Sequence, residues 1–477
     1  MSESLKDKTS KGLLWSALER FSVQGIQFLV MLVMARLLTP DDYGLVGMAA
    51  IFIAITGSLV DSGFSQALIR KQNRTDVDKS TVFYFNIIVS IVLYGVIFVM
   101  APYVSDFYEM PILTWVIRMI CLVCIVNSFG VVQRAEFITK LDFKSLTVST
   151  LLASAVSGCI GIYMALSGYG VWALVVQQVV SAVITNLVLW ILSKWRPLVV
   201  FSWESFHELF SFGSKLMLSG LLNTTYGQIY PIVIGKLFSA DSLGNYNRAS
   251  HFAQFPSSNL TTIMQRVTYP VLCGIQSEDD RLREIYRKFL KMSAFVVFPL
   301  MMLLSALSFP MIDVLIGEKW RFCSELLQII CFSLMWYPIH AINLNLLQVK
   351  GRSDLFLKLE IIKKILGISV LVASAPFGLV AMCYAKIGSS IICLVINTYY
   401  TGKLINVGFM KQMYDLFPTL LLSGVMFIIV LLMTHLIENQ FLTLIVGGGA
   451  GLLIYLTGST IFKFQELQDV KALIRKK

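Results

Sequence analysis

The sequence predicts an all-α, polytopic membrane protein. Of its 477 residues, 56% are hydrophobic and 14% are charged, whereas soluble domains carry roughly 25% charged residues. The mean hydropathy of +0.74 implies more apolar surface than soluble domains of this length could bury. Apolar stretches of roughly 20 residues, the length a helix needs to cross a bilayer, recur along the whole chain. The bilayer is therefore the expected solvent.

About fourteen membrane-spanning helices are expected from these stretches. Their approximate limits are 12–38, 44–69, 80–101, 112–132, 146–166, 170–193, 212–237, 244–272, 289–309, 323–349, 359–375, 378–401, 414–436 and 441–462. The first stretch carries Glu19 and Arg20 and has no small-residue cleavage site before the next span. We therefore expect it to remain in the protein as a helix, unlike a signal peptide.

The positive charges predict the orientation of these helices. The chain has 39 Lys and Arg against 28 Asp and Glu, a net charge of +11. Most of the cations fall at the two termini and in the loops that share a side with them. Because cytoplasmic loops of membrane proteins are enriched in Lys and Arg, we expect both termini in the cytoplasm. Topology accounts for these charges, so no nucleic-acid partner is expected.

The sequence has few features of an enzyme. The eight cysteines lie mostly in apolar stretches, without the spacing of a disulfide framework or a zinc site. A nucleotide-binding Gly-rich loop, paired carboxylates and a Ser/His/Asp grouping are also missing. The glycines at 447–449 and 451 lie in the last expected span, where small residues favour close helix packing. We therefore expect no catalytic residue, no metal and no cofactor.

An internal repeat predicts two pseudo-symmetric lobes. Residues 35–44 resemble residues 235–244, and residues 168–173 resemble 376–381. Both matches fall at corresponding topological positions six helices apart, and Thr39 and Ser239 are suited to cap the helices that follow them. The expected domains are residues 1–200 with helices 1–6, residues 201–402 with helices 7–12, and residues 403–477 with two appended helices and a basic tail. Carriers with such repeats bind substrate at the interface between the lobes and move by rocking one lobe against the other.

Two of the expected spans carry a polar stripe, which is costly if it faces lipid. Steps of three and four residues place the polar side chains of each stripe on one helix face. The eighth span has Asn247, His251, Gln254, Ser258, Thr261, Gln265 and Thr268, flanked by Arg266, and the first has Arg20, Gln24 and Gln27. Hydrogen bonding between packed helices could produce such patterns, and Arg20 could reach the cytoplasmic surface. We interpret both stripes as the lining of a substrate cavity.

A second group of polar residues within the spans suggests coupling or gating. Asp61 could pair with a cation or take up a proton, although a role in helix packing is equally consistent. His340 and Asn343 lie beside a proline in the tenth span. Arg118 and Lys386 lie near the outer ends of their spans, from which they could also reach the surface.

The motifs resemble those of the polysaccharide transport branch of the multidrug/oligosaccharidyl-lipid/polysaccharide exporter superfamily, the Wzx-type flippases, and in particular its colanic acid and teichuronic acid exporter-like members. The residues that carry the resemblance are 35–38 with Tyr43 and Gly44, 61–63, 140–143, 245–249, 266–270, 282–286, 317–320 and 350–352. The resemblance implies a fourteen-helix, two-lobed carrier that moves an undecaprenyl-diphosphate-linked oligosaccharide across a bacterial cytoplasmic (inner) membrane for lipopolysaccharide or exopolysaccharide biosynthesis.

This cargo fits the polar stripes. In related flippases cavity arginines on the first and eighth spans are implicated, which points to Arg20 and Arg266 here, and a guanidinium is suited to bidentate phosphate contacts. The expected partners are the lipid-linked glycan, membrane lipids and polysaccharide polymerase machinery. Coupling to H⁺ or Na⁺ stays open. The alternatives are a cation-coupled multidrug exporter and a membrane polysaccharide polymerase or ligase, although the latter generally has a large outer loop.

Overall fold

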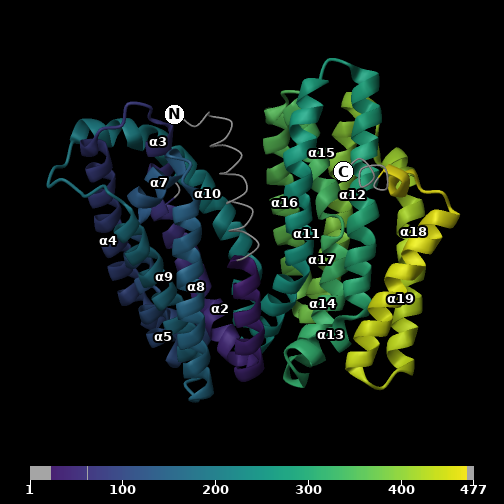
Figure 1. Ribbon diagram of the computed structural model, residues 1–477, viewed down its shortest axis with the longest axis horizontal. Coiled ribbons are helices and arrows are strands. Elements are labelled where there is room, and N and C mark those ends of the chain that lie inside the picture. Colours follow the sequence, from purple (N-terminus) through teal and green to yellow (C-terminus); the bar gives the residue numbers. More distant parts are fainter. Residues whose placement is uncertain (1–22, 62, 470–477) are drawn as a thin grey trace, which may run out of the picture. The chain divides into compact units, whose positions relative to one another are not determined.

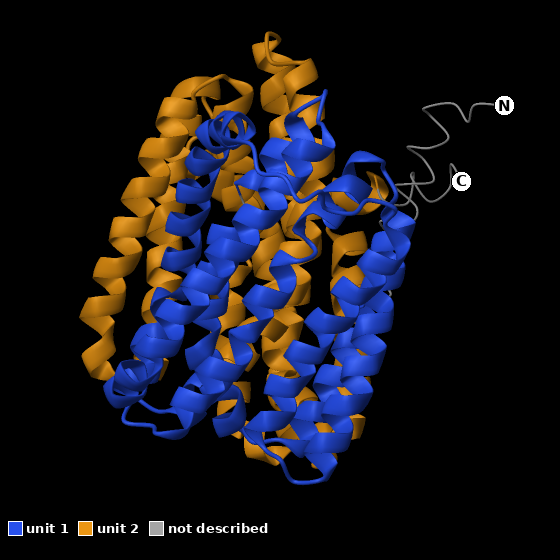
Figure 2. Cartoon of the chain, turned by 90° about the vertical axis from the view of Figure 1, so that its left-hand side faces the viewer, with its two compact units in different colours: residues 1–244 blue, residues 245–477 orange. Residues whose placement is uncertain are grey.

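The computed structural model describes residues 23–61 and 63–469, and every regular element in those ranges is a helix (Figure 1). The contacts divide the chain into two compact units, Met1–Gly244 and Asn245–Lys477 (Figure 2). The all-α, polytopic fold class predicted from the sequence is confirmed.

The first unit consists of helices throughout its described residues. They are the Val23–Leu37 helix, α2 (Pro40–Asp61), α3 (Phe64–Arg70), α4 (Asp76–Tyr108), α5 (Ile112–Ile120), α6 (Leu122–Ser128), α7 (Val131–Thr139), α8 (Phe143–Leu166), α9 (Val171–Leu192) and α10 (Trp203–Leu237). The next helix, α11 (Ala240–Gly274), begins in this unit and continues into the second.

The second unit has the same all-helical construction. Its elements after α11 are α12 (Asp279–Ala306), α13 (Ser308–Leu315), η1 (Glu318–Trp320), α14 (Arg321–Leu334), α15 (Tyr337–Val349), α16 (Ser353–Ser374), η2 (Ala375–Phe377), α17 (Leu379–Ile405), α18 (Phe409–Leu436) and α19 (Gln440–Ile461). Helix α12 packs along α18, and α18 packs along α19, so the two appended helices are an integral part of this unit.

The number of spans is smaller by strict criteria than the sequence suggested. In the described ranges, nine helical segments are long and apolar enough to cross a membrane, or ten if one bent pair counts as a single span. That pair is the expected fourth span, in which Ile112–Ser128 and Val131–Thr139 are bent by 46°. Helices α10, α11 and α16 are long but less apolar, and Val23–Leu37 is shorter. Within the described residues a helix occupies each expected span, but the count of fourteen is not confirmed.

Capping explains why α2 and α11 begin where they do. Thr39 accepts a hydrogen bond from the backbone of Asp42 at 3.3 Å, and Asp42 accepts one from the backbone of Thr39 at 3.0 Å. Ser239 caps α11 by accepting from the backbone of Ser242 at 3.1 Å. These bonds satisfy amide groups that have no partner within the helix. The capping roles predicted for Thr39 and Ser239 in the repeat are confirmed.

The second echo of the repeat also has a structural counterpart. Gly170 precedes α9 with φ +54°, and Gly378 precedes α17 with φ +98°. Residues other than glycine rarely adopt such positive φ values. The two glycines therefore start corresponding helices with the same backbone requirement.

The two copies of the first repeat segment cross at very close range within the first unit. A Cβ atom on Gly44 would lie 1.8 Å from the carbonyl oxygen of Ala240, and a Cβ atom on Gly244 would lie 1.9 Å from that of Pro40. Pro40 and Ala240 occupy equivalent positions in the repeat. Each copy therefore presents a glycine to the backbone of the other, as small residues do where membrane helices pack closely.

Helix α10 packs with the first unit, against α2, α3 and α4. At one end a Cβ atom on Gly63 would lie 2.5 Å from the carbonyl oxygen of Gly213, so both glycines permit backbone contact between α3 and α10. The two units are defined by contacts within the structure, and α10 belongs to the first of them. The domain limits 1–200, 201–402 and 403–477 were instead placed by the sequence repeat, and they stay a prediction.

Asp415 fixes one end of α18 to α12. Its carboxylate accepts two hydrogen bonds of 2.6 Å from Arg287 and lies 3.4 Å from Lys291, and its side chain is only 1% exposed. We expect Asp415→Ala to lower the free energy of unfolding by about 1–3 kcal/mol, since bonds to charged groups are lost while the cations stay partly solvated. Thermal unfolding of the purified protein in detergent measures this. Glu438→Ala, at the exposed far end beyond α18, is the matched control, and equal stability of the two variants would contradict the expectation.

Candidate functional site

The polar stripe predicted on the eighth span lies on one continuous helix, α11. In its first half the opposite face is buried in the protein, with Ala249 and Ala253 at 0% and Phe252 at 5% exposure. On the stripe itself His251 and Gln254 are exposed, and Asn247 and Ser258 are half-buried. This part of the stripe therefore faces away from the packed interior.

The second half of the stripe lies against neighbouring helices. Thr261 and Thr268 are buried, and the hydroxyl of Thr261 donates to the carbonyl oxygen of Ser257. Gln265 is half-buried and donates a hydrogen bond of 3.3 Å to the side chain of Asn345 on α15. The first half of the stripe is thus an exposed polar face, and the second half makes polar packing contacts. Helical spacing alone does not distinguish exposed polar residues from packed ones.

A cavity adjoins the exposed part of the stripe in the second unit. It has a volume of about 250 Å³ and is lined by Gln254, Ser257, Ser258, Leu334 and Tyr337. The hydroxyl of Ser257 is committed to the carbonyl oxygen of Leu334, at 2.8 Å. Gln254 and Ser258, both predicted from the sequence, and the hydroxyl of the exposed Tyr337 are therefore polar groups that can meet a ligand there.

Arg266 lies on α11 with an exposed side chain. Within the part of the chain that the structure describes, it makes no hydrogen bond or ion pair with another residue. Its predicted partner in cargo binding, Arg20, lies outside the described residues, as does the side chain of Asp61. The roles predicted for Arg20 and Asp61 stay predictions.

The first span contributes to a cavity in the first unit. Gln24 is half-buried, and Gln27 is exposed and donates a hydrogen bond of 3.4 Å to Ser154 on α8. Gln27 lines a cavity of about 290 Å³ together with polar residues that the sequence analysis missed: Ser154, Ser157, Gln177, Gln178 and Ser181. Helical spacing on the fifth and sixth spans was the available signal, but these spans are so apolar overall that no long stripe stood out.

His340 and Asn343 are parts of buried hydrogen-bond networks. The ring nitrogens of His340 lie 3.0 Å from the side-chain amide of Asn397 and 3.2 Å from the hydroxyl of Ser390. Asn343 is 1% exposed. It accepts from Thr401 at 2.8 Å and exchanges two hydrogen bonds of 3.0 Å with Gln412. Asn343 therefore ties α15 to α17 and α18, and its predicted gating role with His340 is untested.

Arg118 and Lys386 both have partners close by. The guanidinium of Arg118 donates to the carbonyl oxygen of Phe98 at 3.2 Å and lies 3.9 Å from the centre of the Phe98 ring. Lys386 donates to the hydroxyl of Tyr246 at 3.2 Å. Arg118 lies among exposed apolar residues such as Trp115, at 58% exposure, where a stacked guanidinium can face the bilayer surface.

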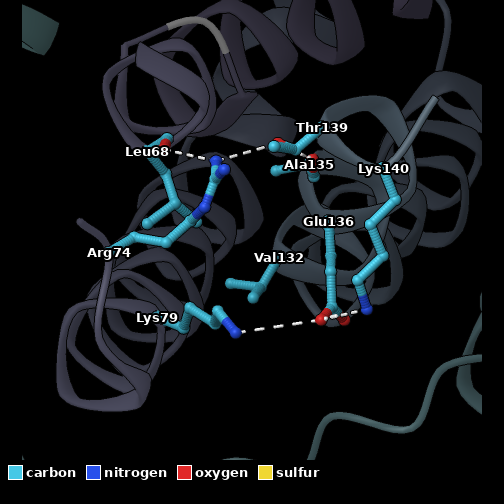
Figure 3. A pocket seen from close by; sticks show the side chains of 8 residues that line it. All are labelled: Leu68, Arg74, Lys79, Val132, Ala135, Glu136, Thr139 and Lys140. Carbon is cyan, nitrogen blue, oxygen red and sulfur yellow. Dashed lines mark hydrogen bonds and ion pairs between the residues drawn. The ribbon is translucent and has the colours of Figure 1, made fainter. Parts of the chain in front are cut away.

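Loops predicted to share a side of the membrane lie together in the first unit. Lys79 and Lys140 approach the carboxylate of Glu136 at 3.8 and 2.8 Å, beside a pocket of about 100 Å³ (Figure 3). Arg74 donates to Thr139 at 3.0 Å, which joins the segment before α4 to the end of α7. Burial lowers the pKa of the nearby Lys71, but hydrogen bonds to Glu208 and Asp78 outweigh it and raise the pKa above its ordinary value.

The same arrangement holds in the second unit. Lys350 contacts Asp279 at 2.6 Å, and Arg283 donates to the carbonyl oxygen of Ile405 at 2.8 Å. These contacts join the first turns of α12 to the residue after α15 and to the end of α17. In each unit, therefore, the loops to which the sequence assigned one common side meet at one end.

A known protein family matches more than half of the chain. The family described as Polysaccharide biosynthesis protein matches residues 33–325. The chain belongs to this family. The resemblance to polysaccharide exporters drawn from the sequence motifs is therefore confirmed.

Two relatives illustrate the polysaccharide biosynthesis protein family. The teichuronic acid biosynthesis protein TuaB of Bacillus subtilis (strain 168) is 24% identical over 95% of each chain. The lipopolysaccharide biosynthesis protein WzxC of Escherichia coli (strain K12) is 25% identical over 77% of this chain and 75% of the relative. Among solved structures, the lipid II flippase MurJ in an inward closed conformation aligns with a TM-score of 0.77 at 15% identity, over 94% of this chain and 98% of that one. The chain therefore shares the fold of this polytopic membrane protein.

Two motifs within the matched residues 33–325 contact each other in the second unit. Trp320, from the Gly-Glu-Lys-Trp motif, is fully buried, and the guanidinium of Arg248 lies 5.9 Å from its ring centre. Tyr246, two residues before Arg248, accepts the hydrogen bond from Lys386. These family motifs therefore fix the start of α11, the helix that carries the exposed polar stripe.

Proposed function

We propose that this protein carries an undecaprenyl-diphosphate-linked oligosaccharide across the bacterial cytoplasmic membrane, for surface polysaccharide biosynthesis. The observation that carries the proposal is the exposed polar face in the first half of α11, with His251 and Gln254, together with the exposed Arg266 further along this helix of a membrane protein. Polar side chains facing lipid are costly, so this face borders a wetted passage. Family membership, the names of the relatives and the MurJ-like fold support a transporter with a polysaccharide precursor as cargo.

The chemistry of the passage matches the proposed cargo. Arg266 offers a guanidinium that can make bidentate hydrogen bonds to a diphosphate. Asn247, Gln254 and Ser258 offer neutral donors and acceptors for sugar hydroxyls. The polyprenyl chain can remain in the lipid, and the transporter needs no catalytic group to move the intact molecule. The passage opens alternately to the two sides of the membrane in this proposal.

The charges support the proposed orientation in the membrane. The loops that meet at one end of each unit carry Arg74, Lys79 and Lys140 in the first unit and Arg283 and Lys350 in the second. The enrichment of Lys and Arg in cytoplasmic loops supports placing these ends, and with them both termini, in the cytoplasm. Polymerase machinery on the outer side would then receive the glycan.

A cation-coupled multidrug exporter is the main alternative. Such a carrier needs buried carboxylates for the coupling ion and for a cationic drug. The α11 stripe and the cavity beside it contain no Asp or Glu, while Arg266 adds a positive charge. This charge favours an anionic cargo. Coupling to H⁺ or Na⁺ would be tested by transport into vesicles with and without an ionophore for each ion.

Deletion of the gene tests the function directly. In a strain without a redundant exporter, we expect lipid-linked glycan units to accumulate on the cytoplasmic side and the surface polymer to disappear. Extraction and chromatography of the lipid-linked glycans, together with quantification of the polymer, measure both effects, and plasmid-borne expression of the protein is the control. An unchanged polymer combined with increased drug sensitivity would favour the multidrug exporter.

A further inference from the structure

The first unit holds a polar cavity of its own. The Val23–Leu37 helix, α8 and α9 line an open pocket of about 290 Å³, just below the range for small-molecule sites, roughly 300–1,000 Å³. The polar lining consists of Gln27, Ser154, Ser157, Gln177, Gln178 and Ser181, with Tyr43 and apolar side chains completing the wall.

Small residues on α8 create this cavity. A Cβ atom on Gly158 would lie 2.6 Å from a methyl group of Val30, so the Val23–Leu37 helix approaches α8 closely there. A Cβ atom on Gly161 would lie 3.1 Å from Cβ of Gln177, which brings α9 in on the other side. Ser154 and Ser157, on the same helix, are too short to fill the space between these two contacts.

The polar groups in this cavity are available for a ligand. Among the residues that the structure describes, the side chains of Gln177, Gln178 and Ser181 make no hydrogen bond to another part of the protein. Two primary amides and a hydroxyl are costly to desolvate without partners. They must therefore meet water or the hydroxyl groups of a bound molecule.

The lining is also electrically neutral. None of the described residues that line the cavity is Asp, Glu, Lys, Arg or His. Among these lining residues a phosphate would find no cation and a cationic drug would find no carboxylate. A sugar ring is neutral and carries several hydroxyls that both donate and accept, and amide and hydroxyl side chains match this pattern.

We propose that the cavity between the Val23–Leu37 helix, α8 and α9 is a glycan subsite, in which Gln177 and Gln178 bind sugar hydroxyls of the lipid-linked cargo. This proposal rests on the proposed function and adds that the sugar and the diphosphate of the cargo are bound at separate places. The neutral cavity selects for sugar, and its volume suits part of a glycan more than a whole repeat unit. The diphosphate is recognised elsewhere, by cations such as Arg266.

Binding of two lipids to the full-length protein in nanodiscs tests whether this cavity recognises the sugar and not the diphosphate. The probes are undecaprenyl diphosphate and the native lipid-linked glycan extracted from the deletion strain. For the unaltered protein we expect tighter binding of the glycan-bearing lipid. The double variant Gln177→Leu/Gln178→Leu should bind this lipid about tenfold more weakly, as expected for two lost hydrogen bonds, and should bind undecaprenyl diphosphate as the unaltered protein does.

Two further variants complete the experiment. Ser181→Leu fills the cavity without removing an amide and should have the same selective effect, which guards against misfolding of the double variant. Thr150→Val is the matched control on α8, because the Thr150 hydroxyl bonds only within its own helix, to Leu146 and Thr147. Unchanged binding of both lipids by the double variant and by Ser181→Leu would overturn the glycan subsite and leave the proposed function standing. Failure of the unaltered protein to bind either lipid would overturn both.

Discussion

Replacement of Gly44 by alanine is expected to prevent most of the protein from folding. The new methyl group would lie 1.8 Å from the carbonyl oxygen of Ala240, and a backbone atom cannot move aside as a flexible side chain can. Overpacking commonly costs about 1–3 kcal/mol even where side chains can adjust, so a backbone clash at a helix crossing should cost at least as much. Gly244→Ala should have the same effect through Pro40.

Fluorescence-detected size-exclusion chromatography of a tagged protein measures the folded fraction. Gly57→Ala is the matched control on the same helix, because nothing lies within 4 Å of a Cβ atom at that position. The control should fold at least as well as the unaltered protein, since alanine favours a helix over glycine by roughly 0.5–1 kcal/mol. If Gly44→Ala and Gly244→Ala also gave normal amounts of folded protein, the close crossing of the two repeat segments would be wrong.

Replacement of Arg266 by alanine is expected to stop export while leaving the protein folded. The Arg266 side chain is exposed and has no hydrogen bond or ion pair within the described parts of the chain, so its removal should hardly change stability. Hydrogen bonds to charged groups contribute about 1.5–3 kcal/mol each. Loss of a guanidinium that binds the cargo diphosphate should therefore lower the export rate at least about tenfold.

Complementation of the deletion strain, with polymer and membrane-bound protein quantified together, tests the Arg266 prediction. Arg266→Lys keeps the charge but loses the bidentate geometry and should restore part of the export. Lys358→Ala removes an exposed cation from α16 and should leave export unchanged. Full export by Arg266→Ala at normal protein levels would remove Arg266 from the transport pathway.

Much of the fold follows from local sequence properties. Within the described residues each expected span is occupied by helix, because apolar stretches of this length have few alternatives in a bilayer. The repeat predicted the caps at Thr39 and Ser239 and the shared role of Gly170 and Gly378. It could not predict the 46° bend in the fourth span. That span breaks near Gly130, where a Cβ atom would lie 1.7 Å from the side chain of Asn186 on α9, a residue distant in sequence.

The candidate site was predicted only in part. Helical spacing grouped Gln254 with Thr261, yet Gln254 is exposed beside a cavity and Thr261 is buried with its hydroxyl bonded within α11. Conversely, Gln177 and Gln178 lie in a strongly apolar span, where they do not extend into a long polar stripe, and the sequence therefore did not single them out. Periodicity reports which residues share a helix face, but it does not report what that face meets.

The sequence by itself determined that this chain is a membrane protein, where its helices run and which loops share a side, because hydropathy and charge act locally on each segment. The tertiary structure decided which intramembrane polar groups are available to a ligand. Asn343 is fully engaged by Thr401 and Gln412 from two other helices, whereas Gln177 and Gln178 have no such partner in the described structure. A buried polar group must be paired or solvated, and only the packing of distant helices settles which of the two applies.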